Sequence, residues 1–222
     1  MIEEYLRVPL STITLAASQT LYMVGWSLVA GAVLGMLLAI VVVLTRPGGL
    51  HANRAVFFVV STVVNVVRSV PFIILMVTIM PLTKIIVGTR VGTTAALVPL
   101  IVHVGPYLAR LFENSMLEVD NGIIEAAQSM GATTPQVIWY FLIPEAKASL
   151  VLALTTGTIG LLGSTTMAGT IGGGGVGNLA LTYGYERMNT PLMIVTVILL
   201  VALVQILQSI GDTISRRMRH LD

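Results

Sequence analysis

The stretch DNGIIEAAQSMGATTPQVIWYFLIP, which runs from Asp120 to Pro144, decides the fold because it is polar and rich in turn signals while the sequence on both sides is apolar. Asp120 or Asn121 can cap a short helix through a side-chain oxygen. Gly131 follows that helix in the position of a C′ glycine, which ends helices by adopting a left-handed conformation. The stretch therefore begins with a short helix that ends at a tight turn. The apolar residues expected to share one face of this helix are Ile123, Ala127 and Met130.

A second helix is predicted directly after this turn. Thr134 is a favourable N-cap residue, and Pro135 follows it at the first helical position, where the missing N–H is not needed. We expect this helix to end at Pro144, because proline disrupts a helix interior. The loop, at about residues 113–147, carries no nucleophile, metal-ligand set or nucleotide motif. It is therefore better suited to docking a partner than to catalysis, and an ordinary helical connector is the alternative.

The same stretch resembles the EAA loop of bacterial ABC importer permeases. Glu125-Ala126-Ala127 is followed after three residues by Gly131, and nine further residues lead to Phe141-x-Ile143-Pro144. The pattern of that family is EAA, three residues, G, nine residues and I-x-L-P. Phe141 and Ile143 are thus apolar replacements that keep a hydrophobic face.

The resemblance covers roughly residues 11–217 and is closest to permeases of methionine-type importers, on the strength of RSVPFIILM at 68–76, IVGT at 86–89 and the glycine-rich run after Met167. It implies a permease subunit that forms the translocation pathway, most closely for methionine, and that is not itself an enzyme. It also implies a homodimer, two ATP-binding ABC subunits and an extracytoplasmic substrate-binding protein or lipoprotein. No cofactor is expected in this chain, because the partner subunit would bind and hydrolyse ATP.

In such permeases the first loop helix sits in a cleft of the ATPase subunit and transmits its closure. The resemblance therefore assigns the contact with the ATPase to the EAA pattern of the loop. In this pattern the small alanines permit close approach, the glycine permits the turn and the glutamate supplies a charge. Carried over to this sequence, the coupling residues are Glu125, Ala126, Ala127, Gly131 and Pro144.

Composition independently indicates an integral membrane protein. Of 222 residues, 55% are hydrophobic and only 10% are charged, which leaves too little polar surface for a soluble globule. The absence of cysteine excludes disulfides and cysteine-ligated zinc, and no metal site is expected. The formal charge of +2 does not indicate nucleic acid, because the basic residues are scattered singly between apolar runs.

Apolar runs long enough to cross a bilayer predict an all-α fold with five transmembrane helices and one domain, 1–222, in which the EAA-type loop joins spans three and four. Gly31 and Gly35 form a GxxxG step in the first span, where another helix can approach closely. The expected spans are 13–44, 55–80, 94–111, 150–167 and 191–210, the second interrupted by Asn65, Arg68 and Pro71.

The distribution of Lys and Arg predicts the orientation of a multi-pass bacterial inner-membrane protein. With five spans the two termini lie on opposite sides, and the side richer in basic residues faces the cytoplasm. This places the loop and the C-terminus in the cytoplasm and the N-terminus outside. No cleaved signal peptide is expected, because Glu3 and Glu4 stand where a signal peptide carries basic residues. The inner group is Arg46, Arg54, Arg110, Lys147, Arg216, Arg217 and Arg219; the outer group is Arg7, Lys84, Arg90 and Arg187.

Candidate residues of the translocation path are the polar or disruptive residues within the spans: Asn65, Arg68, Ser69, Pro71 and Met167. An arginine at membrane depth is costly unless paired or hydrated, so Arg68 either contacts substrate or ties helices together. Met167 has small neighbours and is either a hydrophobic gate or a packing residue. His103 lacks an acidic companion on its span, which favours a structural role over a proton relay.

Two other functions are disfavoured. A formal GxGxxG occurs at Gly172, Gly174 and Gly177, but a membrane helix precedes it where a nucleotide site requires a strand, and a closely packed extracytoplasmic turn is favoured. An intramembrane enzyme would need a catalytic constellation, and neither a Gly-x-Ser-x-Gly nor a His-Glu-x-x-His sequence occurs. The remaining alternatives are a permease for another amino acid or small amphiphile and, less favoured, a passive channel.

Overall fold

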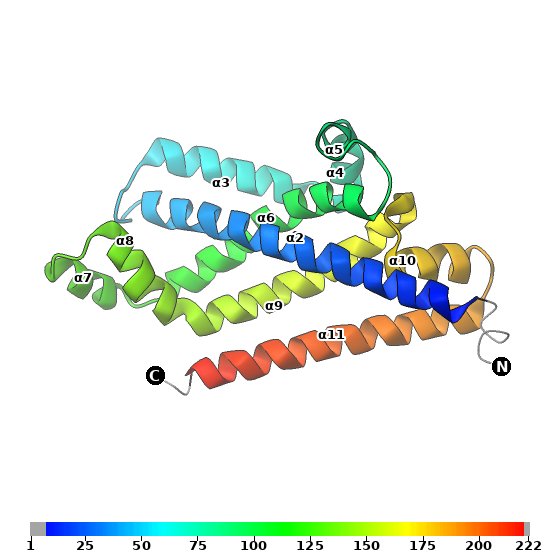
Figure 1. Ribbon diagram of the computed structural model, residues 1–222. Helices are drawn as coiled ribbons and strands as arrows, with labels where there is room; N and C mark the ends of the chain where they lie inside the picture. The colour runs from blue at the N-terminus through cyan, green and yellow to red at the C-terminus, as the bar shows by residue number, and fades with distance from the viewer. Residues whose placement is uncertain (1–7, 220–222) are drawn as a thin grey trace.

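The computed structural model describes residues 8–219, and every regular element within that range is a helix (Figure 1). The long helices run side by side as an elongated bundle. The short helices α7 and α8 and the end of α11 lie at one end of the bundle, and α4, α5 and α10 lie at the other (Figure 1). The predictions that concern Glu3, Glu4 and Arg7 fall outside the described residues.

The first span is the helix α2, Leu10–Thr45, which packs mainly against α6, Thr93–Leu117. Its 36 residues exceed the roughly 20 that a bilayer requires. The GxxxG step lies at the contact: a Cβ at Gly31 would stand 2.3 Å from Val104 Cγ1, and a Cβ at Gly35 would stand 2.9 Å from the Gly105 carbonyl oxygen. The predicted close approach of another helix at this step is confirmed.

The second apolar run, predicted over residues 55–80 with an interruption that includes Pro71, is bent at that proline. It forms α3, Arg54–Ser69, and α4, Phe72–Thr78, whose axes differ by 105°, and then α5, Met80–Val87. The cause is Pro71, because the residue before a proline is disfavoured in helical conformation, and Val70 is extended with φ −83° and ψ 123°. Within residues 8–219, four helices are long and apolar enough to cross a membrane, or five if the bent pair counts as one span.

The loop after α6 comprises α7, Asn121–Ser129, and α8, Thr134–Gln136. A π-helical turn η1, Val137–Leu142, joins α8 to α9, Ile143–Ala168. The predicted break at Pro144 is wrong, because the chain stays helical from Thr134 through η1 to the end of α9 at Ala168. In the π-helical turn the Ile143 N–H bonds to the Ile138 carbonyl five residues earlier. In a regular α-helix the Tyr140 carbonyl would accept a hydrogen bond from the N–H of residue 144, which proline lacks. The π-helical turn does not use that hydrogen bond, so Pro144 is tolerated.

The glycine-rich run reverses the chain at the end of α9. It forms the turn η2, Gly169–Gly173, and then α10, Gly175–Asn178, η3, Leu179–Tyr185, and the last span α11, Thr190–Arg219. A Cβ at Gly177 would stand 2.3 Å from Thr166 Cα, so the turn is packed tightly, as predicted. Two side chains of α2 hold it: Gln19 Oε1 accepts from the Gly175 N–H at 2.8 Å, and Thr20 Oγ1 accepts from the Val176 N–H at 2.9 Å.

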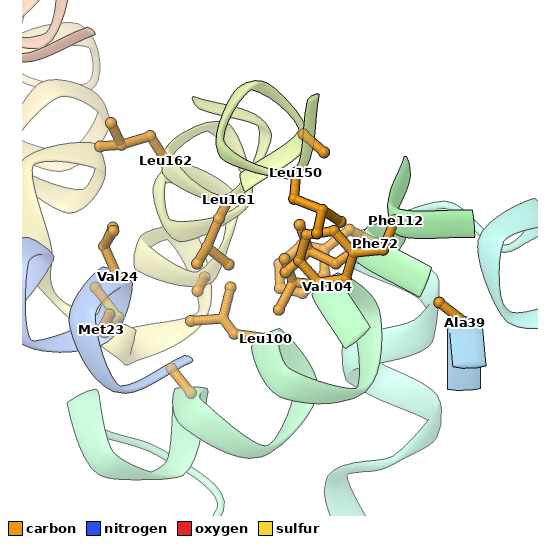
Figure 2. Packing of buried hydrophobic residues seen from close by; sticks show 14 of the residues in the cluster. Met23, Val24, Ala39, Phe72, Leu100, Val104, Phe112, Leu150, Leu161 and Leu162 are labelled. Carbon is orange, nitrogen blue, oxygen red and sulfur yellow. The ribbon is translucent and has the colours of Figure 1, made fainter. Parts of the chain in front are cut away.

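The core lies where α2, α4, α6 and α9 meet (Figure 2). Leu100, Val104 and Phe112 project from α6 toward Leu161 and Leu150 of α9 and are almost fully buried. Large apolar side chains also cover the outward faces of α2, α3 and α11. That pattern suits a bundle whose outer surface meets lipid, since a bilayer does not penalise exposed apolar groups.

Candidate coupling loop and translocation path

The helix α7 has the caps that the sequence predicts. Asp120 Oδ1 accepts from the Gly122 N–H at 2.6 Å, which fixes the first turn. Gly131 has φ +80°, and the Ala132 N–H donates to the Ala127 carbonyl at 3.1 Å. The predicted left-handed glycine after α7 is confirmed.

The cap of the second helix lies one residue earlier than predicted. The N-cap of α8 is Thr133, whose N–H donates to Gln136 Oε1 at 2.8 Å in a capping box. Thr134 is therefore the first helical residue and Pro135 the second. The hydroxyl of Thr134 instead lies 2.7 Å from His51 Nε2, which ties the loop to the chain segment after α2.

The three residues of the EAA pattern do not face the same way. Glu125 and Ala126 are exposed, whereas Ala127 is 0% exposed and packs within the loop. Met130, expected on the apolar face, is the C-cap of α7 and is 70% exposed, so that prediction is wrong. The outer surface of α7 thus offers the carboxylate of Glu125, the small side chain of Ala126 and the flexible thioether of Met130. Helical periodicity did not predict the exposure of Met130, because α7 ends before this residue.

A cavity of about 500 Å³ lies beneath α7, between this helix and the turn after α2. Glu125 and Gln128 line one side and Arg46 lines the other. The turn after α2 therefore takes part in shaping the loop, which the EAA pattern alone does not indicate.

Of the predicted path residues, Asn65 belongs to a polar network between α3 and α6. Its Oδ1 accepts from Arg110 Nη2 at 3.0 Å, and the same nitrogen donates to Ser61 Oγ at 2.6 Å. Arg110 also pairs with Glu113 at 2.5 Å. Sequence reasoning missed this network, although opposite charges three residues apart in an apolar helix are a signal for it. Ser69 bonds only locally, donating to the Asn65 carbonyl at 2.8 Å.

Arg68 lies at the end of α3 and opens onto a second cavity. Its guanidinium carbon stands 6.0 Å from the centre of the Tyr107 ring on α6. The His103 ring, one turn earlier on α6, lies 5.1 Å from the Phe72 ring on α4. Pro71 lies at the bend between α3 and α4 and does not line this cavity. Of the predicted path residues, the cavity therefore includes Arg68 and neither Pro71 nor Met167.

Met167 lies near the end of α9 and is 49% exposed. The other exposed residues over the last turns of α9 follow helical spacing on the same face: Thr156, Gly160 and Gly163. Thr170 in η2 is exposed as well. This face differs from the outward faces of α2 and α11, which expose leucine, isoleucine and valine. A face of small and hydroxylated residues is typical of a helix that meets protein or water rather than lipid.

Arg68 and Arg110 lie within α3 and α6, whereas the other described basic residues belong to the ends of helices or the turns between them. The end of α2 and the starts of α3 and α9, which carry Arg46, Arg54 and Lys147, lie at the end of the bundle with α7, and so does the end of α11 (Figure 1). Lys84 belongs to α5 and Arg187 to the turn before α11, at the other end (Figure 1). The coupling loop and the end of α11 therefore share the more basic end.

Comparisons with known proteins agree over nearly the full length. The family described as "Binding-protein-dependent transport system inner membrane component" matches residues 31–220. The chain is 48% identical to the probable D-methionine transport system permease protein MetI of Vibrio cholerae, over 92% of this chain and 91% of that protein. It is 45% identical to the methionine import system permease protein MetP of Bacillus subtilis, over 78% of each chain.

A solved structure described as inward-facing conformations of the MetNI methionine ABC transporter contains a chain that is 41% identical, with a TM-score of 0.92. The match covers 94% of this chain and 97% of that one. The family match, the full-length relatives and the shared fold lead to one assignment. This chain belongs to the binding-protein-dependent transport system inner membrane component family of membrane permeases.

Proposed function

We propose that the chain is the permease subunit of an ABC importer for methionine. The observation that carries this proposal is the 48% identity over 92% of the chain to a protein named as a D-methionine permease. The permease acts as a homodimer, since two copies are the simplest way for so few helices to enclose a pathway. Two ATP-binding subunits bind and hydrolyse ATP, and an extracytoplasmic binding protein delivers the solute.

In this proposal the helix α7 couples the ATPase to the path. Glu125 and Ala126 contact the ATPase directly, because both are exposed on α7. Ala127 and Gly131 act from beneath, by packing the loop and by setting the turn that orients α7. Pro144 marks the π-helical turn through which the loop continues into α9, so a displacement of α7 is transmitted along that helix.

The end of the bundle that carries α7 faces the cytoplasm, and the N-terminus lies outside. The greater number of basic residues at that end supports this orientation through the positive-inside rule.

The path runs between the two copies along the exposed face of α9. Met167 from each copy narrows it, because an apolar constriction excludes water and ions without a charged gate. Arg68, Ser69 and Pro71 border the path, and Asn65 supports it through Arg110.

The test is to co-purify the chain in mild detergent with its ATPase and to reconstitute both with the binding protein in liposomes. ATP-dependent methionine uptake is expected, with both D- and L-methionine as competitors. Uptake that needs no ATP would indicate a passive channel. If another amino acid inhibits the ATP-dependent uptake far better than methionine does, methionine is not the main substrate, but the chain is still the permease of an ABC importer.

A further inference from the structure

The second cavity lies between α3, α6 and α9. Its volume is about 340 Å³, at the small end of the range for ligand pockets, which is roughly 300–1,000 Å³. Arg68 is 14 residues beyond the start of α3 at Arg54, so it lies about 21 Å along the helix at 1.5 Å per residue. The residues that line the cavity are Arg68, His103, Val104, Tyr107, Gly160 and Leu161.

Within the part of the chain that the structure describes, the guanidinium of Arg68 has no counterion. Among residues 8–219 no carboxylate lies within salt-bridge distance of it, and its one recorded contact is with the Tyr107 ring. A cation at this depth is costly unless it is paired or faces water. The other arginine on this side of α6, Arg110, is fully paired through Glu113 and Asn65. Arg68 therefore differs from Arg110 in being open to an anion from outside the chain.

A second polar group in the cavity also lacks a partner. His103 Nδ1 is buried and makes no hydrogen bond to any described residue. Buried polar atoms are nearly always bonded, so an unbonded one beside a cavity indicates water or a ligand. The rest of the lining is apolar or aromatic: Val104, Leu161 and the ring of Tyr107.

We propose that this cavity binds the transported solute by its carboxylate, with Arg68 as the carboxylate ligand and with Tyr107 and Leu161 in contact with an apolar side chain. This inference rests on the proposed function, because it makes the cavity a station on the import path. An arginine and a carboxylate form charge-assisted hydrogen bonds, which are stronger than neutral ones.

The lining also sets the chemical class of the solute. No acidic residue lines the cavity, so a basic side chain would bring a second cation beside Arg68 without a counterion. Like charges in a site of low dielectric repel strongly. The cavity therefore favours small amino acids with uncharged, largely apolar side chains over basic ones.

The first experiment measures binding of radiolabelled methionine to the purified permease–ATPase complex, with methionine and methioninol as competitors. Methioninol lacks the carboxylate, so it should compete about 10- to 100-fold less well with the wild type, the range expected for one charge-assisted hydrogen bond. Arg68→Gln should remove most of this difference, and Arg68→Lys should restore part of it. Lys84→Gln, a charge removal on α5 outside the cavity, is the matched control and should retain the difference.

Thermal stability and ATP-dependent uptake in liposomes are measured on the same variants. A merely structural Arg68 predicts lower stability with the preference for methionine over methioninol unchanged, and that outcome would overturn the proposal. Normal uptake and preference in Arg68→Gln would overturn it as well, while the importer function would stand. If the wild-type complex imports no methionine, the proposed function itself fails.

Gly160 gives an independent test at the wall of the cavity. A Cβ there would stand 3.7 Å from Tyr107 Cε1, an ordinary contact, so Gly160→Ala should assemble, and its methyl group should weaken methionine binding less than a larger side chain does. Gly160→Phe should assemble but lose methionine binding and uptake, because its ring fills the cavity. Gly25→Phe, at an open glycine on α2, is the control for a bulky residue on a membrane helix. Normal binding in Gly160→Phe would exclude the cavity as the site.

Discussion

Arg110 on α6 donates two hydrogen bonds to the side chain of Asn65 on α3, with Nε and Nη2 at 3.2 and 3.0 Å from Oδ1. The same guanidinium donates to Ser61 Oγ and pairs with Glu113, which is 7% exposed. Within residues 8–219, Ser61 and Asn65 thus join α3 to α6 through this one guanidinium. This network therefore fixes the position of α3, and through it the position of Arg68 one turn beyond Asn65.

Arg110→Met should destabilise the protein by about 3–5 kcal/mol, because it leaves the buried Glu113 carboxylate without its partner. The free energy of unfolding in mixed detergent micelles measures this. The double variant Arg110→Met with Glu113→Leu should recover most of the loss, since no unpaired charge remains. A double variant as unstable as the single one would show that the ion pair is not the cause.

Gly131→Val should weaken co-purification of the ATPase and lower methionine uptake. The φ of +80° costs a residue with a side chain about 1–2 kcal/mol, and no atom lies within 4 Å of the added Cβ, so strain and not a clash is the cause. Gly131→Asn is the matched control and should retain most coupling, because asparagine tolerates this conformation. Equal loss in both variants would point to a contact at this position.

Part of the coupling loop could be predicted from the sequence, because some of its structural signals act locally. A glycine with positive φ and an aspartate cap act over a few residues, so Gly131 and Asp120 could be assigned from sequence. The continuation through Pro144 could not, because it depends on a π-helical turn whose hydrogen-bond register the sequence does not reveal. The same holds for Met130, whose exposure follows from where α7 ends.

The path residues were harder to predict because their roles depend on neighbours distant in sequence. Asn65 and Arg68 look alike as polar residues in one apolar run, yet one is bound by Arg110 and the other opens onto a cavity. The bend at Pro71 decides this difference by turning α4 across α6. Periodicity predicts which residues lie in a helix but not which helix a given face meets.

Gly31→Ala should cost about 1–3 kcal/mol of stability, because the new methyl group would stand 2.3 Å from Val104 Cγ1. Val104→Ala in the same chain removes that atom and should recover part of the loss. Gly35→Ala meets two backbone atoms of α6, the Gly105 carbonyl oxygen and the Ala109 nitrogen, as well as Leu108 Cβ, so shortening one side chain should not recover the loss. The measurement is thermal unfolding of four variants: Gly31→Ala, Val104→Ala, the double variant of these two, and Gly35→Ala. If the effects of Gly31→Ala and Val104→Ala simply add in the double variant, the packing argument is wrong.

Single cysteines test the orientation on a chain that has none of its own. Met130→Cys in the coupling loop should react with an impermeant thiol reagent only from the cytoplasmic side. Glu186→Cys, in the exposed turn before α11, should react only from outside. Labelling of intact cells and of inverted vesicles distinguishes the sides. The reverse pattern would overturn both the topology and the docking of α7 on an ATPase.

Met167→Ala should raise solute leak through liposomes that hold the reconstituted complex without ATP, while stability changes little. Met167 is 49% exposed, and substitutions of such side chains usually change stability by less than about 0.5 kcal/mol. A packing methionine behaves differently: Met193, whose side chain touches Gly184, should lose stability as Met193→Ala without any leak. An apolar constriction also predicts that Met167→Leu stays tight, because it keeps the apolar bulk that excludes water. If the Met167→Ala complex is less stable but shows no additional solute leak, Met167 is a packing residue and the gate lies elsewhere on the exposed face of α9.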